Sequence, residues 1–367
     1  MLDSTASATS HDPFSILARL VLSKRNQDAV ESPEGRALLT LNSTAFQDLI
    51  TLAQQNHVTI RALCAFQNIM CHGNHDLHAD RTENALASER ARIWNAIEYL
   101  RAICECFEKE GLDVTVIKSL DHWPDFGNDI DLYTNASSDD VCRLMRSRFQ
   151  AEIAPRSWGD RLACKWNFLI PGLPEAVEIH VGRLGQTGEQ QKIASQLPHR
   201  SRYIDIGEQL FRVPSVSDRL IISSLQRMYR HFYFRLCDIV DSADLITRRV
   251  IDYLDLSYFA AEAGIWDGVA TYLSIVSDYV LRYSGSELEL PGFVRAAAHF
   301  GGEQVYVRGA FLRVPILPQS AGLYGSQILG LLRARDLENS ARLGLLPWLA
   351  TAAVIGQKLT GTDKGVW

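Results

Sequence analysis

Carboxylates at alternate positions of one short segment are the feature of this sequence best suited to chemistry. Residues 127–133 read Gly-Asn-Asp-Ile-Asp-Leu-Tyr. Because side chains alternate between the two faces of a strand, Asp129 and Asp131 are expected on one face. The intervening Ile130 and Leu132 point the other way, into the core. Two such carboxylates repel each other unless a cation lies between them, and oxygen ligands suit Mg²⁺ or Mn²⁺ rather than Zn²⁺. An isolated Asp-x-Asp is also typical of a polar strand face or an acidic turn, so the spacing needs support elsewhere in the chain.

A second alternating segment, residues 177–181, supplies a third carboxylate. It reads Val-Glu-Ile-His-Val and places Glu178 and His180 on one face of a strand. If this strand neighbours the first, three carboxylates converge, as a two-metal phosphoryl- or nucleotidyl-transfer site requires. Glu178 would then bind metal or act as the base that takes the acceptor's proton. A single histidine on a strand is more often a hydrogen-bonded structural residue, and that interpretation of His180 stays open.

A lysine and a small residue end an earlier β-branched segment. Ser119 lies ten residues before Asp129 and follows Lys118. A strand that stops at a small residue lets backbone N–H groups approach phosphate oxygens, and a lysine there balances their charge. A plain strand end with a surface lysine is the alternative.

Taken together, these residues resemble a bacterial nucleotidyltransferase family of the DNA-polymerase-β-like nucleotidyltransferase superfamily. That family has Lys-Gly at the end of a strand, then Asp-Ile-Asp-Leu, then an acidic-hydrophobic-His triplet. The matching positions here are Lys118-Ser119, Asp129 to Leu132, and Glu178 to His180. The resemblance spans roughly residues 46–283. It departs from the family at Ser119, where the family has glycine, and at residues 125–128, which lack the family's arginine.

The resemblance implies a metal-dependent enzyme that moves a nucleoside monophosphate from an NTP, ATP first, to a small-molecule or protein acceptor. The nucleotide would lie over Ser119, with its triphosphate held by Mg²⁺ or Mn²⁺ on Asp129 and Asp131, and Glu178 would be a further metal ligand or the base. The nucleotide-binding residues would be Lys118, Ser119, His180, Arg227, Arg230 and His231. The run at 226–231 is equally readable as a solvated helix face. Two other functions stay open, a non-catalytic nucleotide- or partner-binding protein and a kinase.

The secondary structure expected from the sequence changes twice along the chain, from helices to short strands and back to helices. Apolar residues recur at helical spacing in residues 14–22, 46–53, 60–70 and 89–109, and Gly111 ends the last of these helices. Short alternating strands and one helix at 138–149 follow, and helical spacing returns after Pro214. The sequence therefore predicts an α+β fold, in which a small mixed β-sheet forms a nucleotidyltransferase core flanked by N-terminal and C-terminal helical regions. The expected boundaries are 1–110 helical, 111–213 the core, 214–300 helical, and 301–367 an extension of uncertain structure.

Composition narrows the function classes further. The chain has 367 residues, a net charge of −6 and seven cysteines without a Cys-x-x-Cys pair. An acidic chain without a basic patch is a poor partner for extended nucleic acid, and scattered cysteines argue against a disulfide framework. Residues 1–14 lack the features of a secretory signal, and the apolar run at 345–355 is too short to span a bilayer. We expect a cytoplasmic protein with no transmembrane segment.

Overall fold

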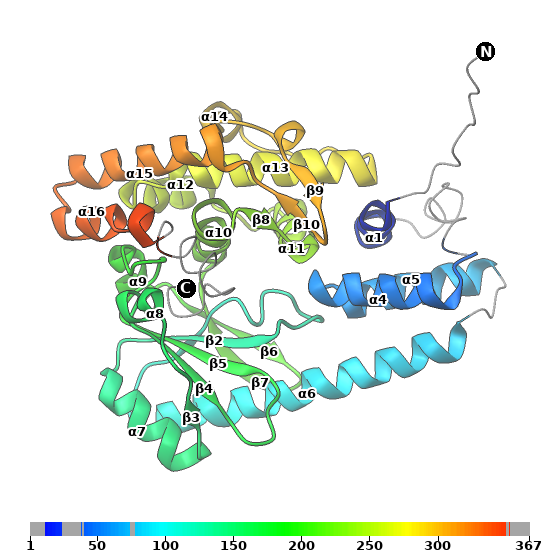
Figure 1. The fold of residues 1–367 in the computed structure, drawn as a ribbon, viewed down its shortest axis with the longest axis horizontal. Helices are drawn as coiled ribbons and strands as arrows, with labels where there is room; N and C mark the ends of the chain where they lie inside the picture. Colours follow the sequence, from blue (N-terminus) through cyan, green and yellow to red (C-terminus); the bar gives the residue numbers. More distant parts are fainter. Residues whose placement is uncertain (1–11, 24–37, 39, 74–77, 350–351, 353–367) are drawn as a thin grey trace.

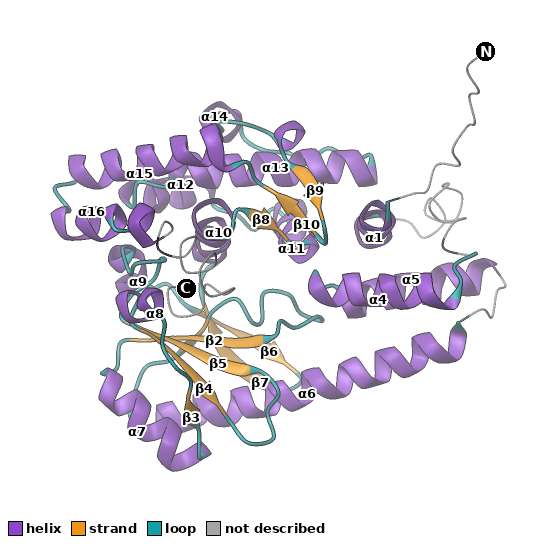
Figure 2. Cartoon of the chain, viewed as in Figure 1, coloured by secondary structure: helices purple, strands orange, loops and turns teal. Residues whose placement is uncertain are grey.

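The computed structural model describes residues 12–23, 38, 40–73, 78–349 and 352. The fold is mixed α+β, as the sequence predicts: a small sheet lies among helices on both of its sides (Figures 1 and 2). None of the described helices combines the length and apolar character that crossing a lipid bilayer requires.

The main sheet has five strands in the order β1-β2-β5-β4-β3. Only the central pair, β2 and β5, is parallel, and the outer neighbours pair antiparallel. The strands are β1 (Thr115–Val116), β2 (Asp129–Thr134), β3 (Glu152–Ile153), β4 (Lys165–Leu169) and β5 (Ala176–Val181). A parallel pair needs a long crossover connection, which here contains α7 (Ser138–Phe149).

The two faces of the sheet differ in polarity because the strands alternate. One face carries Ile130, Leu132, Val177 and Ile179, all fully buried. Helix α7 and the long α6 (Ala79–Lys109) lie on one side of the sheet in Figure 1, and α8 (Trp158–Leu162) and α9 (Gln191–Gln196) lie on the other. The polar face carries the predicted ionisable residues, so the sheet presents its charges toward α8.

The N-terminal helices match the predicted apolar spacing. They are α1 (Pro13–Leu22), α4 (Ser43–Gln55), α5 (Thr59–Gly73) and α6. The stripe along α6 that includes Ile97, Leu100 and Phe107 is fully buried. The helix ends at Lys109, and Gly111 follows with a φ of +71°, a left-handed conformation that glycine adopts without strain. Asp125, distant in sequence, accepts hydrogen bonds from the first backbone N–H groups of α5, those of Ile60 and Arg61.

A hairpin not predicted from the sequence follows the main sheet, within the last residues of the predicted core. Strands β6 (Arg202–Ile206) and β7 (Gln209–Val213) pair antiparallel around Gly207 and Glu208, whose φ values are +60° and +68°. Two consecutive positive φ values are typical of a two-residue turn whose twist matches that of the strands it joins.

The C-terminal half is mostly helical but contains a second small sheet. Its α-helices are α10 (Val216–Ser224), α11 (Leu236–Thr247), α12 (Tyr253–Glu262), α13 (Trp266–Ser284), α14 (Gly292–Ala297), α15 (Ala321–Arg333) and α16 (Leu337–Gly344). A π-helical segment, η1 (Leu225–Arg230), a 3-10 turn, η2 (Gly302–Gln304), and a kinked segment, η3 (Ile316–Ser320), in which Leu317 has an extended backbone, occur between them. The sheet has the order β8-β10-β9 and consists of β8 (Tyr233–Phe234), β9 (Tyr306–Arg308) and β10 (Phe311–Arg313). This pairing joins the region predicted to be purely helical to the extension after residue 300.

Candidate metal and nucleotide site

Two of the three predicted carboxylates lie side by side. The parallel register of β2 and β5 puts Asp131 directly opposite Glu178. Both side chains are buried, with 4% of Asp131 and 9% of Glu178 exposed. Side chains at paired positions of neighbouring strands share one face of the sheet, so the two carboxyl groups meet without help from any loop.

His180 completes this cluster. Its Nε2 lies 2.8 Å from Oε1 of Glu178 and 4.0 Å from Oδ1 of Asp131. One potential ligand atom each from Asp131, Glu178 and His180 lies within 4.8 Å of the others. Burial lowers the pKa of His180 to about 4, so the ring is neutral near pH 7. We call these three residues the acidic cluster.

Two lysines contact the acidic cluster. Lys118, whose left-handed backbone (φ +65°) carries the chain out of β1, forms an ion pair with Asp131 and lies 3.6 Å from Glu178. Lys165 on β4 lies 3.0 Å from Glu178 and 2.8 Å from Asp160 of α8. Lys165 faces the cluster because β4 pairs with β5 with Lys165 opposite His180. The sequence-based prediction did not include Lys165 or Asp160.

Burial and charge act in opposite directions on the two carboxyl groups. Burial raises the pKa of Asp131 well above its usual value, and the nearby carboxylates of Asp129 and Glu178 add to this against the opposing effect of Lys118. Burial would also raise the pKa of Glu178, but Lys118, His180 and Lys165 outweigh it and hold that pKa well below its usual value. A cation bound between the two groups would oppose the effect of burial on both of them.

The charges around the cluster fit a divalent cation. Four carboxylates lie there, those of Asp129, Asp131, Asp160 and Glu178, and two ammonium groups, those of Lys118 and Lys165. With His180 neutral, four negative and two positive charges leave two negative charges unbalanced when every carboxyl group is ionised. Asp131 and Glu178 would hold the cation, and Lys118 would have to release Asp131 for it to bind.

Asp129 lies at the edge of the site and outside the three-residue cluster. It is half-buried at the start of β2. A Cβ added at Gly127 would lie 3.5 Å from Oδ1 of Asp129 and 3.4 Å from Cε1 of His57. These are ordinary van der Waals distances, so an alanine side chain would fit at Gly127, between Asp129 and His57.

Ser119 has a positioning role in this structure. Its Oγ accepts a hydrogen bond of 2.7 Å from the backbone N–H of Asp131. Its own backbone N–H donates to the carbonyl oxygen of Ile117. The serine hydroxyl thus attaches the end of β1 to the strand that carries the metal-binding candidate, a contact that glycine could not make.

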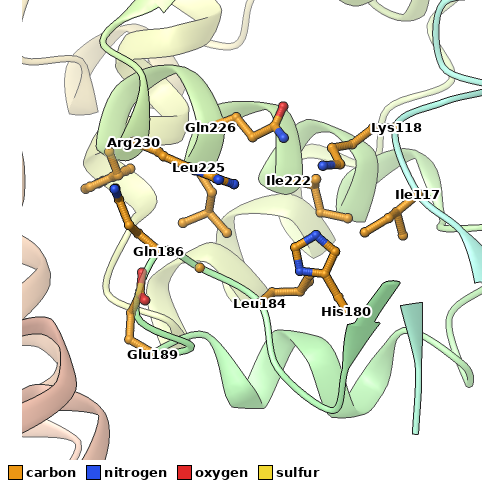
Figure 3. A pocket seen from close by; sticks show the side chains of 12 residues that line it. Ile117, Lys118, His180, Leu184, Gln186, Glu189, Ile222, Leu225, Gln226 and Arg230 are labelled. Carbon is orange, nitrogen blue, oxygen red and sulfur yellow. The ribbon is translucent and has the colours of Figure 1, made fainter. Parts of the chain in front are cut away.

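A cavity of about 720 Å³ opens beside the acidic cluster. Pockets for cofactors and small molecules commonly have volumes of about 300–1,000 Å³. Lys165 and His180 line it from the sheet, and Arg230 and His231 line it from the C-terminal half. The remaining lining combines polar residues, including Asp160 and Gln186, with apolar ones, including Met228, Phe232, Ile316, Leu346 and Pro347. A smaller adjoining cavity lies between Lys118 and His180 on one side and Gln226 and Arg230 of η1 on the other (Figure 3).

The three basic residues predicted from the run at 226–231 separate in space. Arg230 and His231 line the large cavity. Arg227 instead forms a 2.7 Å ion pair with Asp238 of α11, and both side chains are 3% exposed. The residues of this run therefore form neither a solvated helix face nor a single binding surface. The reason is that η1 is a π-helix, which has more residues per turn than an α-helix and so points neighbouring side chains in different directions.

The other aspartates of α11, an Asp-rich helix, also have partners of their own. Asp241 pairs with Arg61 at 2.7 Å and Asp244 with Arg248 at 2.9 Å. Asp238, Asp241 and Asp244, which are spaced three residues apart, therefore each form an ion pair with a different arginine. None of them belongs to the acidic cluster.

Comparison with known proteins does not assign the chain to a family. No protein family model matches the chain. No curated protein matches it either.

Proposed function

We propose that this protein is a divalent-metal-dependent nucleotidyltransferase of the DNA-polymerase-β-like type, which moves a nucleoside monophosphate from an NTP to a small-molecule or protein acceptor. The observation that carries the proposal is the parallel register of β2 and β5, which sets Asp131 opposite Glu178 next to a ligand-sized cavity. The expected metal is Mg²⁺ or Mn²⁺, the expected first donor is ATP, and the expected compartment is the cytoplasm, where both are available.

The residues divide into metal-binding and nucleotide-binding groups. Asp131 and Glu178 would hold one cation, with Asp129 at the edge. Such a cation neutralises charge on the transferred phosphate and on the leaving pyrophosphate. Arg230 and Lys165 line the cavity and would bind phosphate oxygens, and the neutral His180 would accept or donate a hydrogen bond there.

One observation favours a second candidate function. The ammonium group of Lys118 already lies against Asp131 and within 3.6 Å of Glu178, as a bound cation would. A protein that keeps this arrangement would bind a nucleotide or a partner without transferring anything. The two functions differ in whether pyrophosphate is released.

Product analysis distinguishes them. The purified chain is incubated with each NTP labelled at the α-phosphate, with Mg²⁺ or Mn²⁺ and a cell lysate as the source of acceptor. Label transferred to an acceptor together with released pyrophosphate supports nucleotidyl transfer. Nucleoside diphosphate as the product identifies a kinase instead, and saturable NTP binding without either product identifies the binding protein.

A further inference from the structure

A second group of potential metal ligands shares no residue with the acidic cluster. It consists of His57, between α4 and α5, His122, in the segment that joins β1 to β2, and Cys237, in α11. One potential ligand atom from each lies within 4.8 Å of the others. The three residues come from three parts of the chain, and we call them the His-His-Cys cluster.

His57 is the member of this cluster whose ring nitrogens have no hydrogen-bond partner. Only 5% of the residue is exposed, and both ring nitrogens are buried without a hydrogen-bond partner. Buried polar atoms almost always have a partner, so an imidazole with two unpaired nitrogens calls for a ligand.

The backbone holds His57 close to Cys237. The carbonyl oxygen of Asn56 accepts a hydrogen bond from the backbone N–H of Cys237, and its side-chain oxygen accepts one from the N–H of Leu236. Asn56 itself is fully buried. The start of α11 is thus attached to the residue next to His57, and the cluster does not depend on a flexible loop.

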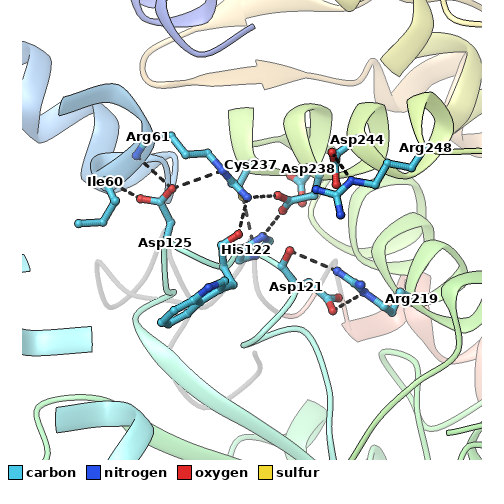
Figure 4. A network of polar contacts seen from close by, with 12 residues as sticks. Ile60, Arg61, Asp121, His122, Asp125, Arg219, Cys237, Asp238, Asp244 and Arg248 are labelled. Atoms are coloured by element: carbon cyan, nitrogen blue, oxygen red, sulfur yellow. Dashed lines mark hydrogen bonds and ion pairs between the residues drawn. The ribbon is translucent and has the colours of Figure 1, made fainter. Parts of the chain in front are cut away.

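His122 is oriented as histidine ligands of metals usually are. Its Nδ1 lies 2.5 Å from Oδ2 of Asp241, and its Nε2 lies 3.8 Å from Sγ of Cys237 (Figure 4). A carboxylate on one ring nitrogen fixes the other as the metal-binding atom. A sulfur and a nitrogen ligand of one tetrahedral zinc ion lie about 3.6 Å apart, given Zn–S and Zn–N distances of about 2.3 and 2.05 Å.

The ion pairs around the cluster join three carboxylates, of Asp121, Asp125 and Asp241, to two guanidinium groups, of Arg61 and Arg219. Against the opposing effect of burial, Cys237 and Asp241 raise the pKa of His122 well above its usual value, so a metal ion would have to displace a proton from that ring. Two imidazoles and one thiolate are the ligand types that select Zn²⁺ over Mg²⁺.

The same contacts could also suggest a Cys-His-Asp nucleophile. Cys237, however, is fully buried and lines neither cavity of the candidate site. Burial also raises the pKa of its thiol, which opposes the thiolate form that a nucleophile needs in the absence of a metal. A substrate could not reach this sulfur, whereas a metal ion acquired during folding could.

We propose that His57, His122 and Cys237 bind one Zn²⁺ ion, which braces the segment leading from β1 to Asp129 and Asp131. The ion would connect the N-terminal helices, the sheet and α11 at one point. It is distinct from the metal of the acidic cluster, and the proposal does not depend on the proposed transfer reaction.

Metal analysis of the full chain, purified without a polyhistidine tag, tests this proposal. We expect about one zinc per chain by mass spectrometry. The X-ray absorption spectrum of the bound zinc should show one sulfur neighbour and three nitrogen or oxygen neighbours, two of them from the histidine rings. Cobalt added to the zinc-depleted protein should give thiolate-to-cobalt absorption in the near ultraviolet.

Two cysteine variants localise the ion. Cys237→Ser should abolish the cobalt–thiolate absorption and weaken zinc binding at least about 100-fold, because changing only a residue that hydrogen-bonds to a metal ligand already costs about 10–100-fold. Cys104→Ser, which changes a cysteine of α6 outside the cluster, should leave both unchanged. If Cys237→Ser does not fold, the X-ray absorption spectrum of the unaltered protein decides the question. Absence of bound zinc and of cobalt absorption, sulfur-free coordination, or loss of binding in Cys104→Ser would overturn the proposal.

Discussion

Asp131 of β2 and Glu178 of β5 occupy opposite positions of the one parallel strand pair in the main sheet, and both are buried. The relationship places two carboxyl groups at a fixed separation on the polar face of the sheet. Substitutions at Asp131, Lys118, Arg230 and His180 each change a group at this pair or in the cavity beside it, whereas Arg227 lies outside that cavity.

Replacing Asp131 should remove transfer activity and leave the fold intact. Asp131→Asn keeps the shape of the side chain but removes the charge that binds the cation. We expect turnover to fall at least about 1,000-fold, the equivalent of about 4 kcal/mol of transition-state stabilisation. Rates are measured as pyrophosphate release, and circular dichroism checks the fold. The exposed Asp139→Asn serves as the matched control, and an Asp131→Asn protein of normal activity would remove this site assignment.

Replacing Lys118 should reveal the competition between its ammonium group and a metal ion. Lys118→Met leaves the carboxylates of Asp131 and Glu178 without their nearest positive charge. Without metal, the variant should lose about 3–5 kcal/mol of stability, as expected when one partner of a buried ion pair is removed. Mn²⁺ should restore much of the lost stability. The control variant Lys192→Met, at an exposed lysine, should be as stable as the unaltered protein both without metal and with Mn²⁺. Chemical denaturation with EDTA or with Mn²⁺ measures the effect, and a Lys118→Met protein that Mn²⁺ does not stabilise would speak against a cation site here.

The neighbouring arginines of η1 should have different effects when changed. Arg230→Met should raise the KM for the NTP about 10–100-fold, because a hydrogen bond to a charged group contributes about 1.5–3 kcal/mol, with little change in stability. Arg227→Met should instead lower stability by about 3–5 kcal/mol by leaving Asp238 buried and unpaired. Steady-state kinetics and urea denaturation of both variants test the difference. Equal effects of the two changes on KM would contradict the separation of their roles.

Acid should destabilise the fold partly through His180. Its pKa is about 4 in the folded protein and 6.5 when exposed, so between those pH values the unfolded chain binds a proton that the folded protein does not. Stability should therefore fall from pH 6.5 toward pH 4 by up to about 3 kcal/mol from this residue, at about 1.36 kcal/mol per pKa unit. Above pH 6.5 this residue adds no pH dependence.

Urea denaturation in EDTA between pH 4.5 and 7.5 measures this effect. His180→Gln should flatten the slope, whereas the exposed His199→Gln should keep it. An unchanged slope in His180→Gln would show that the pKa of this ring is the same in the folded and unfolded protein.

Local sequence patterns determined most individual elements. The predicted helix at 138–149 matches α7, and the Asp-x-Asp segment is β2 with its aspartates on one face. These features depend on neighbours within a few residues, through alternation, helical spacing and caps such as Ser137. The same patterns also predict the α+β class, because they distinguish strands from helices wherever an element is long enough. The short strands β8, β9 and β10 have only two or three residues each, too few for a pattern.

Only the tertiary structure decided which of these residues meet. A shift of β5 by two residues against β2 would have placed Glu178 opposite Asp129 instead of Asp131, with the same alternation in the sequence. The separation of Arg227 from Arg230, the approach of Lys165 and the gathering of His57, His122 and Cys237 likewise depend on packing between distant segments. Periodicity specifies the face on which a side chain lies, because it is a property of the local backbone. Register and contacts between elements depend on how the whole core is filled, which no single segment encodes.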